Sequence, residues 1–141
     1  MMYKLIEPEV AGSLGEETEL DNSVFPPYVK KLHYEFDGWL GDDILESFPC
    51  YIVTDCLRKD LENNKFTGIS FNDVTVSKSE TFLDIYPNRE LPKFYWLKVG
   101  GESFKDDFFI TKENILAISE KVNLVLQKHN FNNADIEDLQ D

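Results

Sequence analysis

Two segments of the chain repeat one pattern of apolar and polar positions. Each begins with three apolar residues, continues with a hydroxyl residue and an acid, and ends with apolar residues spaced by four. The first copy is Tyr51-Ile52-Val53, Thr54-Asp55, Leu57 and Leu61, and the second is Leu116-Ala117-Ile118, Ser119-Glu120, Val122 and Leu126. A short apolar run predicts a buried strand, and a hydroxyl N-cap followed by an acid predicts the first turn of a helix. We therefore expect two main helices, at about residues 54–64 and 119–129. The repeat is either a duplicated strand–helix unit or two solutions to the same capping problem.

Further strands are predicted where apolar and polar residues alternate or where β-branched and aromatic residues gather. These strands are Met2–Ile6, Leu32–Phe36, Ile69–Val76, Phe94–Val99 and Phe108–Ile110. Asp42 is placed to cap a short helical turn that extends to Ser47, and Gly100-Gly101 predicts a hairpin turn. Strands and helices mix without regular alternation. We therefore expect an α+β fold, a single domain over residues 1–141 with a mixed or mostly antiparallel sheet.

Two stretches show little periodicity. Residues 7–27 contain two Gly, three Pro and six acids, which predicts a long acidic loop. Residues 134–141 are acidic and lie at the end of the chain, so we expect a frayed tail there. Whether the loop is ordered, or is itself a binding element, stays open from the sequence.

The chain is strongly acidic, with 14 basic and 27 acidic residues and a net charge of −13. This excess disfavours nucleic acid and anionic membranes as partners, because both are negatively charged. It suits a basic protein or a divalent cation, although solubility alone is the alternative explanation. No apolar run approaches the ~20 residues of a membrane span, and Met1–Pro8 lacks the apolar core of a secretory signal. We therefore expect the protein in the cytoplasm.

The residue types that carry catalysis are few. Of the bases, only His33 and His129 are imidazoles, and structural roles are expected for both. Cys50 and Cys56 are interpreted as buried thiols, since their spacing suits neither a disulfide nor a zinc site. None of the common hydrolase, metalloprotease or phosphate-loop motifs is present. We therefore expect no enzyme activity and no cofactor.

Two acidic doublets resemble each other, Asp42-Asp43 and Asp106-Asp107. Paired carboxylates can hold a divalent metal ion or act as acid and base, so a metal-dependent hydrolase is one alternative. The spacing matches no calcium loop, and helix capping with ordinary solvation explains the doublets better.

Trp39 lies between two glycines and beside acids, a composition typical of an aromatic interface anchor ringed by charge. The alternative is that Trp39 folds back into the core. On the first interpretation, the candidate partner-binding residues are Glu35, Asp37, Trp39, Asp42, Asp43 and Glu46.

Four short segments, Met2–Leu5, Tyr51–Asp55, Gly68–Phe71 and Ile118–Glu120, resemble the immunity proteins of bacterial polymorphic toxin systems. The resemblance covers about half of the chain. It implies an acidic cytoplasmic protein that binds and blocks a basic cognate toxin domain without catalysis of its own. A scaffold protein, oligomeric or not, is the alternative; among the oligomeric states, a monomer is favoured.

Overall fold

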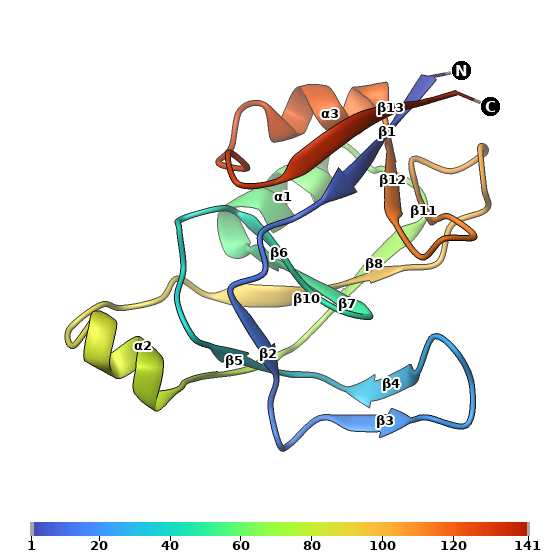
Figure 1. Ribbon diagram of the computed structural model, residues 1–141. Helices are drawn as coiled ribbons and strands as arrows, with labels where there is room; N and C mark the ends of the chain where they lie inside the picture. Colours follow the sequence, from blue (N-terminus) through green and yellow to red (C-terminus); the bar gives the residue numbers. More distant parts are fainter. Residues whose placement is uncertain (1, 141) are drawn as a thin grey trace.

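Two four-stranded antiparallel sheets, each accompanied by one helix, form the centre of the molecule. They are seen in the computed structural model, which describes residues 2–140 (Figure 1). The first sheet has the order β6 (Ile44–Ser47), β7 (Cys50–Thr54), β10 (Phe94–Val99), β8 (Ile69–Asn72). The second has the order β11 (Phe108–Ile110), β12 (Leu116–Ser119), β1 (Met2–Glu7), β13 (Asp135–Gln140). Helix α1 (Asp55–Asn63) follows β7, helix α3 (Glu120–Leu126) follows β12, and the two helices contact each other.

The two sheets are copies of one arrangement, which is the duplicated unit that the sequence pattern suggested. Each copy runs strand, strand, helix, strand: β6-β7-α1-β8 and β11-β12-α3-β13. The side chain of Thr54 accepts the N–H of Leu57 and that of Ser119 accepts the N–H of Val122, so both helices begin with the same cap. Both predicted main helices are confirmed, although each is shorter than expected.

In each sheet, the strand in third position comes from outside the strand–strand–helix–strand segment that forms the other three. β10 immediately precedes the second copy, yet it pairs with β7 and β8 of the first. β1 lies at the beginning of the chain and pairs with β12 and β13 of the second. The first and last strands of the chain therefore lie side by side (Figure 1).

A smaller layer covers one side of the first copy. β2 (Gly12–Leu14), β5 (His33–Phe36) and β9 (Thr75–Lys78) form a three-stranded sheet in which β5 and β9 are parallel. β3 (Glu19–Asp21) and β4 (Tyr28–Lys31) form a hairpin, and α2 (Glu80–Ile85) follows β9. The elements make an α+β domain in which most pairs of strands are antiparallel.

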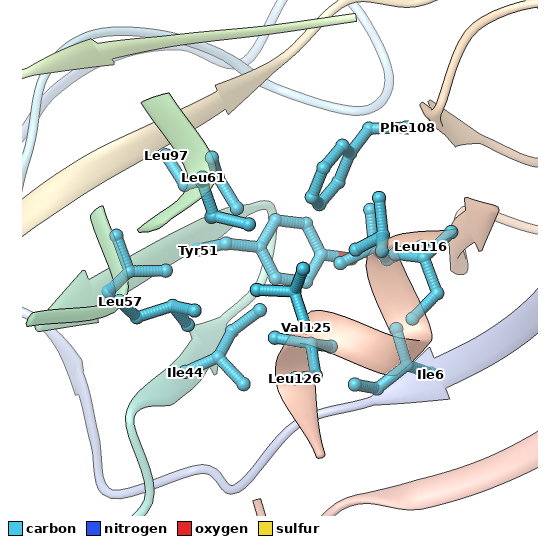
Figure 2. Packing of buried hydrophobic residues seen from close by; sticks show 13 residues of the cluster. Ile6, Ile44, Tyr51, Leu57, Leu61, Leu97, Phe108, Leu116, Val125 and Leu126 are labelled. Carbon is cyan, nitrogen blue, oxygen red and sulfur yellow. The ribbon is translucent and has the colours of Figure 1, made fainter. Parts of the chain in front are cut away.

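The main core lies between the two sheets and their helices. Figure 2 shows the ring of Tyr51 at its centre, with Leu57 and Leu61 of α1 and Val125 and Leu126 of α3 around it. A second cluster packs under the smaller layer and is rich in aromatic rings, among them Tyr34, Phe36, Phe82 and Phe94. Each such buried side chain stabilises the fold by about 1.5–3 kcal/mol relative to exposure.

Two of the predicted irregular stretches form strands instead. The stretch 7–27 contains β2 and β3, and Glu9 forms a single bridge with Leu45, so it is not one long loop. Within 134–141, residues 135–140 form β13 along the whole of β1, and residue 141 lies outside the described residues. Three-residue strands give no periodic signal, and the acids of β13 obscured its alternation.

Four local predictions are also wrong. Residues 44–47 form β6 rather than a helical turn, because Ile44 and Leu45 are both buried. The stretch 69–76 is divided between β8 and β9, which belong to different sheets. Gly100-Gly101 ends β10 without making a hairpin, since β11 pairs with β12. Cys56 is exposed, whereas Cys50 is buried as expected. α2 was missed, although Ser79-Glu80 has the same hydroxyl–acid start as the other two helices.

Candidate functional site

The second aspartate of each doublet fastens one copy of the duplicated unit to the other. In the first copy, Asp43 Oδ1 accepts from Thr54 Oγ1 at 2.9 Å, and its Oδ2 accepts the N–H of Asn130, beyond α3, at 2.8 Å. In the second copy, Asp107 Oδ1 accepts from Ser119 Oγ at 2.8 Å, and its Oδ2 accepts the N–H of Thr67, beyond α1, at 3.0 Å. Each carboxylate thus bonds the helix cap of its own copy and the segment after the helix of the other. We call this reciprocal pair of contacts the aspartate clasps.

The first doublet is fully engaged within the molecule. Asp42 is 1% exposed, and its carboxylate accepts the backbone N–H and the side-chain amide of Asn133, both at 2.9 Å. Asp42 therefore holds the fold and is not a surface group that a partner can reach, whereas Asp43 also holds the fold but its side chain is 17% exposed. Among residues 2–140, no group of three or more His, Cys, Asp or Glu side chains is arranged to hold a metal ion.

Trp39 lies half-buried, between the two roles considered for it. Its indole N–H donates to the carbonyl of Asp42 at 2.9 Å, and its ring meets the edge of Phe94. The guanidinium of Arg89 stacks 4.7 Å from the ring centre and also donates to the Trp39 carbonyl at 2.7 Å. These contacts hold Trp39 in place, so its side chain does not protrude as an anchor. Arg89 takes part in holding it, which the sequence did not reveal.

Glu46 lies in a hollow of about 490 Å³ between the two copies. We call it the acidic hollow because four acidic residues line it, Glu7, Glu9, Glu46 and Asp135. Its remaining lining residues are mostly apolar or uncharged: Ile6, Pro8, Val10, Leu40, Tyr51, Asn114, Ile115 and Asn133. The backbone brings the carboxylates together, because the N–H of Glu46 donates to the carbonyl of Glu9 at 2.9 Å.

Two exposed apolar side chains stand at the edge of the acidic hollow. Val10 is 66% and Leu40 is 67% exposed. Beyond them lies a shallower hollow of about 330 Å³, which Asp37 and Trp39 line. Of the six residues proposed from the sequence, Asp37, Trp39 and Glu46 thus surround this area. Glu35 is half-buried on β5 and lines neither hollow. An apolar centre with a polar rim is the usual anatomy of a protein interface.

Two carboxyls of the acidic hollow are hard to ionise. Burial raises the pKa of Glu9, although the N–H groups of Leu40 and Asp42 oppose this effect by donating to its carboxylate. Burial, with repulsion from Glu7, raises the pKa of Glu46 to about 7. Within residues 2–140, the carboxyl of Glu46 has neither a hydrogen-bond donor nor an ion-pair partner. When it is ionised, Glu46 is therefore a negative charge that the described residues leave uncompensated.

The raised pKa of Glu46 predicts that the protein is less stable at pH 8 than at pH 5.5. Between its ordinary pKa and about 7, the folded protein holds a proton that the unfolded chain releases, so stability falls as the pH rises. We expect a loss of about 1–2 kcal/mol, allowing for solvent screening of a half-buried group. Urea unfolding at the two pH values measures it. Glu46→Gln should remove most of the difference, and an unchanged difference would contradict the assignment.

A second hollow, of about 250 Å³, adjoins the acidic one and shares Tyr51 and Asn114 with it. We call it the aromatic hollow, since Tyr28, Phe48, Tyr51 and Trp96 line it, together with Pro26, Pro27 and Pro49. At its margin Phe25 is 78% exposed, and its ring centre lies 6.0 Å from that of Phe48. Exposed aromatic clusters of this kind mark binding surfaces.

No protein-family model matches the chain, and no curated protein matches it in sequence. Within residues 2–140, no helix is long and apolar enough to cross a membrane. The residues that sequence reasoning missed, Glu7, Glu9, Val10, Leu40 and Asp135, come from three distant segments that only the fold brings together.

Proposed function

We propose that the protein is a non-catalytic binding module that recognises a basic protein through the acidic hollow and the apolar residues beside it. The observation that carries this proposal is the uncompensated carboxyl of Glu46 inside a hollow that three other acids line. A fold rarely keeps a half-buried carboxyl without a partner, because desolvation disfavours its charge. Such local inconsistencies concentrate at functional sites.

A lysine or arginine side chain suits this hollow in both charge and shape. Its cationic head would lie among Glu7, Glu46 and Asp135, and its aliphatic stem would lie along Val10 and Leu40. An arginine could bond two carboxylates at once, because its guanidinium presents a planar fork of donors. Binding would also favour the ionised form of Glu46, so the affinity should rise as the pH increases through 7.

The aromatic hollow supplies the apolar part of the same interface. It shares Tyr51 and Asn114 with the acidic hollow, so one partner surface can reach both. Its aromatic residues are of the kinds that contribute most to the energy of protein interfaces. The partner would therefore present a cation beside a large apolar side chain.

The class of protein that fits best is an immunity protein, as the resemblance in the sequence implies. Toxin domains that act on nucleic acids tend to be basic, since they bind a polyanion. An acidic inhibitor associates faster with such a domain through electrostatic steering, and then blocks it by occupying its surface. This proposal includes a location in the cytoplasm.

The experiment is affinity capture of the tagged protein from its native lysate, with low-salt and high-salt washes and mass identification. We expect one basic partner that the wild-type protein retains at low salt. The double variant Glu7→Lys with Asp135→Lys should weaken its binding by roughly 10–100-fold, as expected when two charge contacts are reversed. Both residues are exposed, so the fold should persist.

The matched control is Glu16→Lys with Asp73→Lys, which changes the net charge equally at two exposed acids outside the acidic hollow. It should retain the partner nearly as well as the wild type. Equal loss in both variants would mean that only net charge matters. Recovery of the protein alone would favour the oligomeric scaffold, which light scattering would then test.

A further inference from the structure

A thiol, an imidazole and a carboxylate form a chain of contacts on the surface of the two central helices. Cys56 Sγ lies 4.0 Å from His129 Nδ1, and His129 Nε2 lies 2.7 Å from Asp60 Oδ2. Cys56 is exposed and is the second residue of the nine-residue helix α1. Nucleophile, base and orienting carboxylate in this order are the elements of an activated thiol.

The fold holds this arrangement in place from both ends. Cys56 and Asp60 are four residues apart on α1 and so share one face of the helix. His129 follows α3, and its side chain is only 7% exposed. The next residue, Asn130, exchanges two hydrogen bonds with Asp43: the Asp43 N–H donates to the Asn130 carbonyl at 2.6 Å, and the Asn130 N–H donates to Asp43 Oδ2 at 2.8 Å. The ring is thus positioned by the same aspartate clasp that joins the two copies.

The hydrogen bond to Asp60 decides which nitrogen can take a proton from the thiol. When Nε2 carries its hydrogen toward Asp60, the lone pair of Nδ1 is left facing Cys56. Asp43 Oδ2 lies 3.6 Å from Nδ1, so two carboxylates stand ready to stabilise the imidazolium that forms. A thiolate at the beginning of a helix is further stabilised by the helix dipole.

We propose that Cys56 is a reactive thiol that His129 deprotonates and that it exchanges with low-molecular-weight disulfides. The proton of Cys56 moves to His129 Nδ1, and the thiolate attacks one sulfur of the disulfide. The S–S bond of the disulfide breaks and a bond from Cys56 to the attacked sulfur forms. The other sulfur leaves as a thiolate and takes the proton from the imidazolium. The exchange is redox-neutral overall, because the disulfide bond is only transferred.

The charges around Cys56 are mixed, so position rather than bulk charge must activate it. On α1 and in the segments packed against it, the charged and titratable groups are Asp43, Asp55, Arg58, Lys59, Asp60, Glu62, Lys93 and His129. Arg58 pairs with Asp55 and Glu62, and Lys59 pairs with Asp55, which leaves His129 as the base in contact with the sulfur. This site is separate from the acidic hollow and does not depend on the function proposed for it.

The experiment uses the aromatic disulfide DTNB as the probe and the intact protein between pH 6 and 9. At pH 6.5 we expect Cys56 to react at least ~10-fold faster in the folded protein than in the same chain unfolded in urea, because His129 is positioned to take the proton of the thiol as the sulfur attacks. Cys56→Ser should leave only the slow reaction of Cys50, which is 4% exposed and whose pKa burial raises to about 12. Mass analysis of the singly modified protein should place the label on Cys56.

His129→Gln and Asp60→Asn separate activation from mere exposure. Both should remove most of the excess rate at pH 6.5 and move the rise of the rate to the pH at which the unfolded chain shows it. Circular dichroism checks that each variant is folded. If His129→Gln does not fold, Asp60→Asn alone tests the activation. A wild-type rate that never exceeds that of the unfolded chain at any pH would overturn the proposal without any variant.

Discussion

Replacing Asp107 with Ala is expected to lower the free energy of unfolding by about 2–4 kcal/mol, a large effect for one polar residue. The change leaves Ser119 Oγ and the N–H of Thr67 without their acceptor and opens one of the two aspartate clasps. Asp43→Ala opens the other clasp and should cost a similar amount. Urea unfolding monitored by circular dichroism measures both, and Asp37→Ala, at an exposed acid, should change stability by less than about 0.5 kcal/mol.

The same variant separates the structural role of the doublet from the metal-dependent hydrolase considered on sequence grounds. If Asp107 bound a metal ion, titration calorimetry with Mg²⁺, Mn²⁺ or Ca²⁺ would give heat with the wild type and none with Asp107→Ala. We expect instead a loss of stability that is independent of these ions. An Asp107→Ala protein as stable as the wild type would contradict the clasp.

Gly101→Ala is expected to destabilise the protein by about 2–4 kcal/mol, whereas Gly100→Ala should be nearly neutral. A Cβ on Gly101 would lie 1.9 Å from the carbonyl oxygen of Phe108 and 2.8 Å from Asp106 Cβ, so the backbone would have to move. A Cβ on Gly100 would meet nothing within 4 Å. Thermal unfolding of these two neighbouring variants provides a matched comparison.

A similar loss in both glycine variants would mean that chain flexibility, and not the contact with Phe108, explains the result. Gly68→Ala offers an independent check, because its Cβ would lie 2.2 Å from the same carbonyl. Gly68 also has a φ of +90, which an L residue rarely adopts. Gly68→Ala should therefore lower the stability of the protein at least as much as Gly101→Ala.

The two main helices were predictable because their signals are local. A hydroxyl residue, an acid and apolar positions spaced by four determine where α1 and α3 begin and which face they bury. The repeat and the resemblance of the two acidic doublets were both visible in the sequence. The relation between them follows only from the fold, in which Asp43 and Asp107 occupy the same place in the two copies.

Strand partners could not be predicted, because they depend on contacts between distant residues. The acidic side chains of β13 are exposed to solvent, and the strand pairs with β1, which lies more than 120 residues away in the chain. The acidic hollow could not be predicted for the same reason, since Glu7, Glu46 and Asp135 belong to three separate segments of the chain. Local composition correctly drew attention to residues 35–46 as rich in acids. It could not distinguish the buried Asp42 from Glu46, which has no partner within the described residues.

The exchange of strands between the two copies has a consequence for how the chain folds during synthesis. β1 is synthesised long before both of its partners, β12 and β13. Until then Tyr3 and Ile6, which are buried on opposite faces of β1, have no sheet to join. The first copy, in contrast, can close as soon as β10 has been made. Contacts of such long sequence separation slow folding and lengthen the time for which an unpaired edge can aggregate. A nascent chain of this protein should therefore hold a folded first copy and an unpaired β1 that depends on chaperones until β12 and β13 have been made.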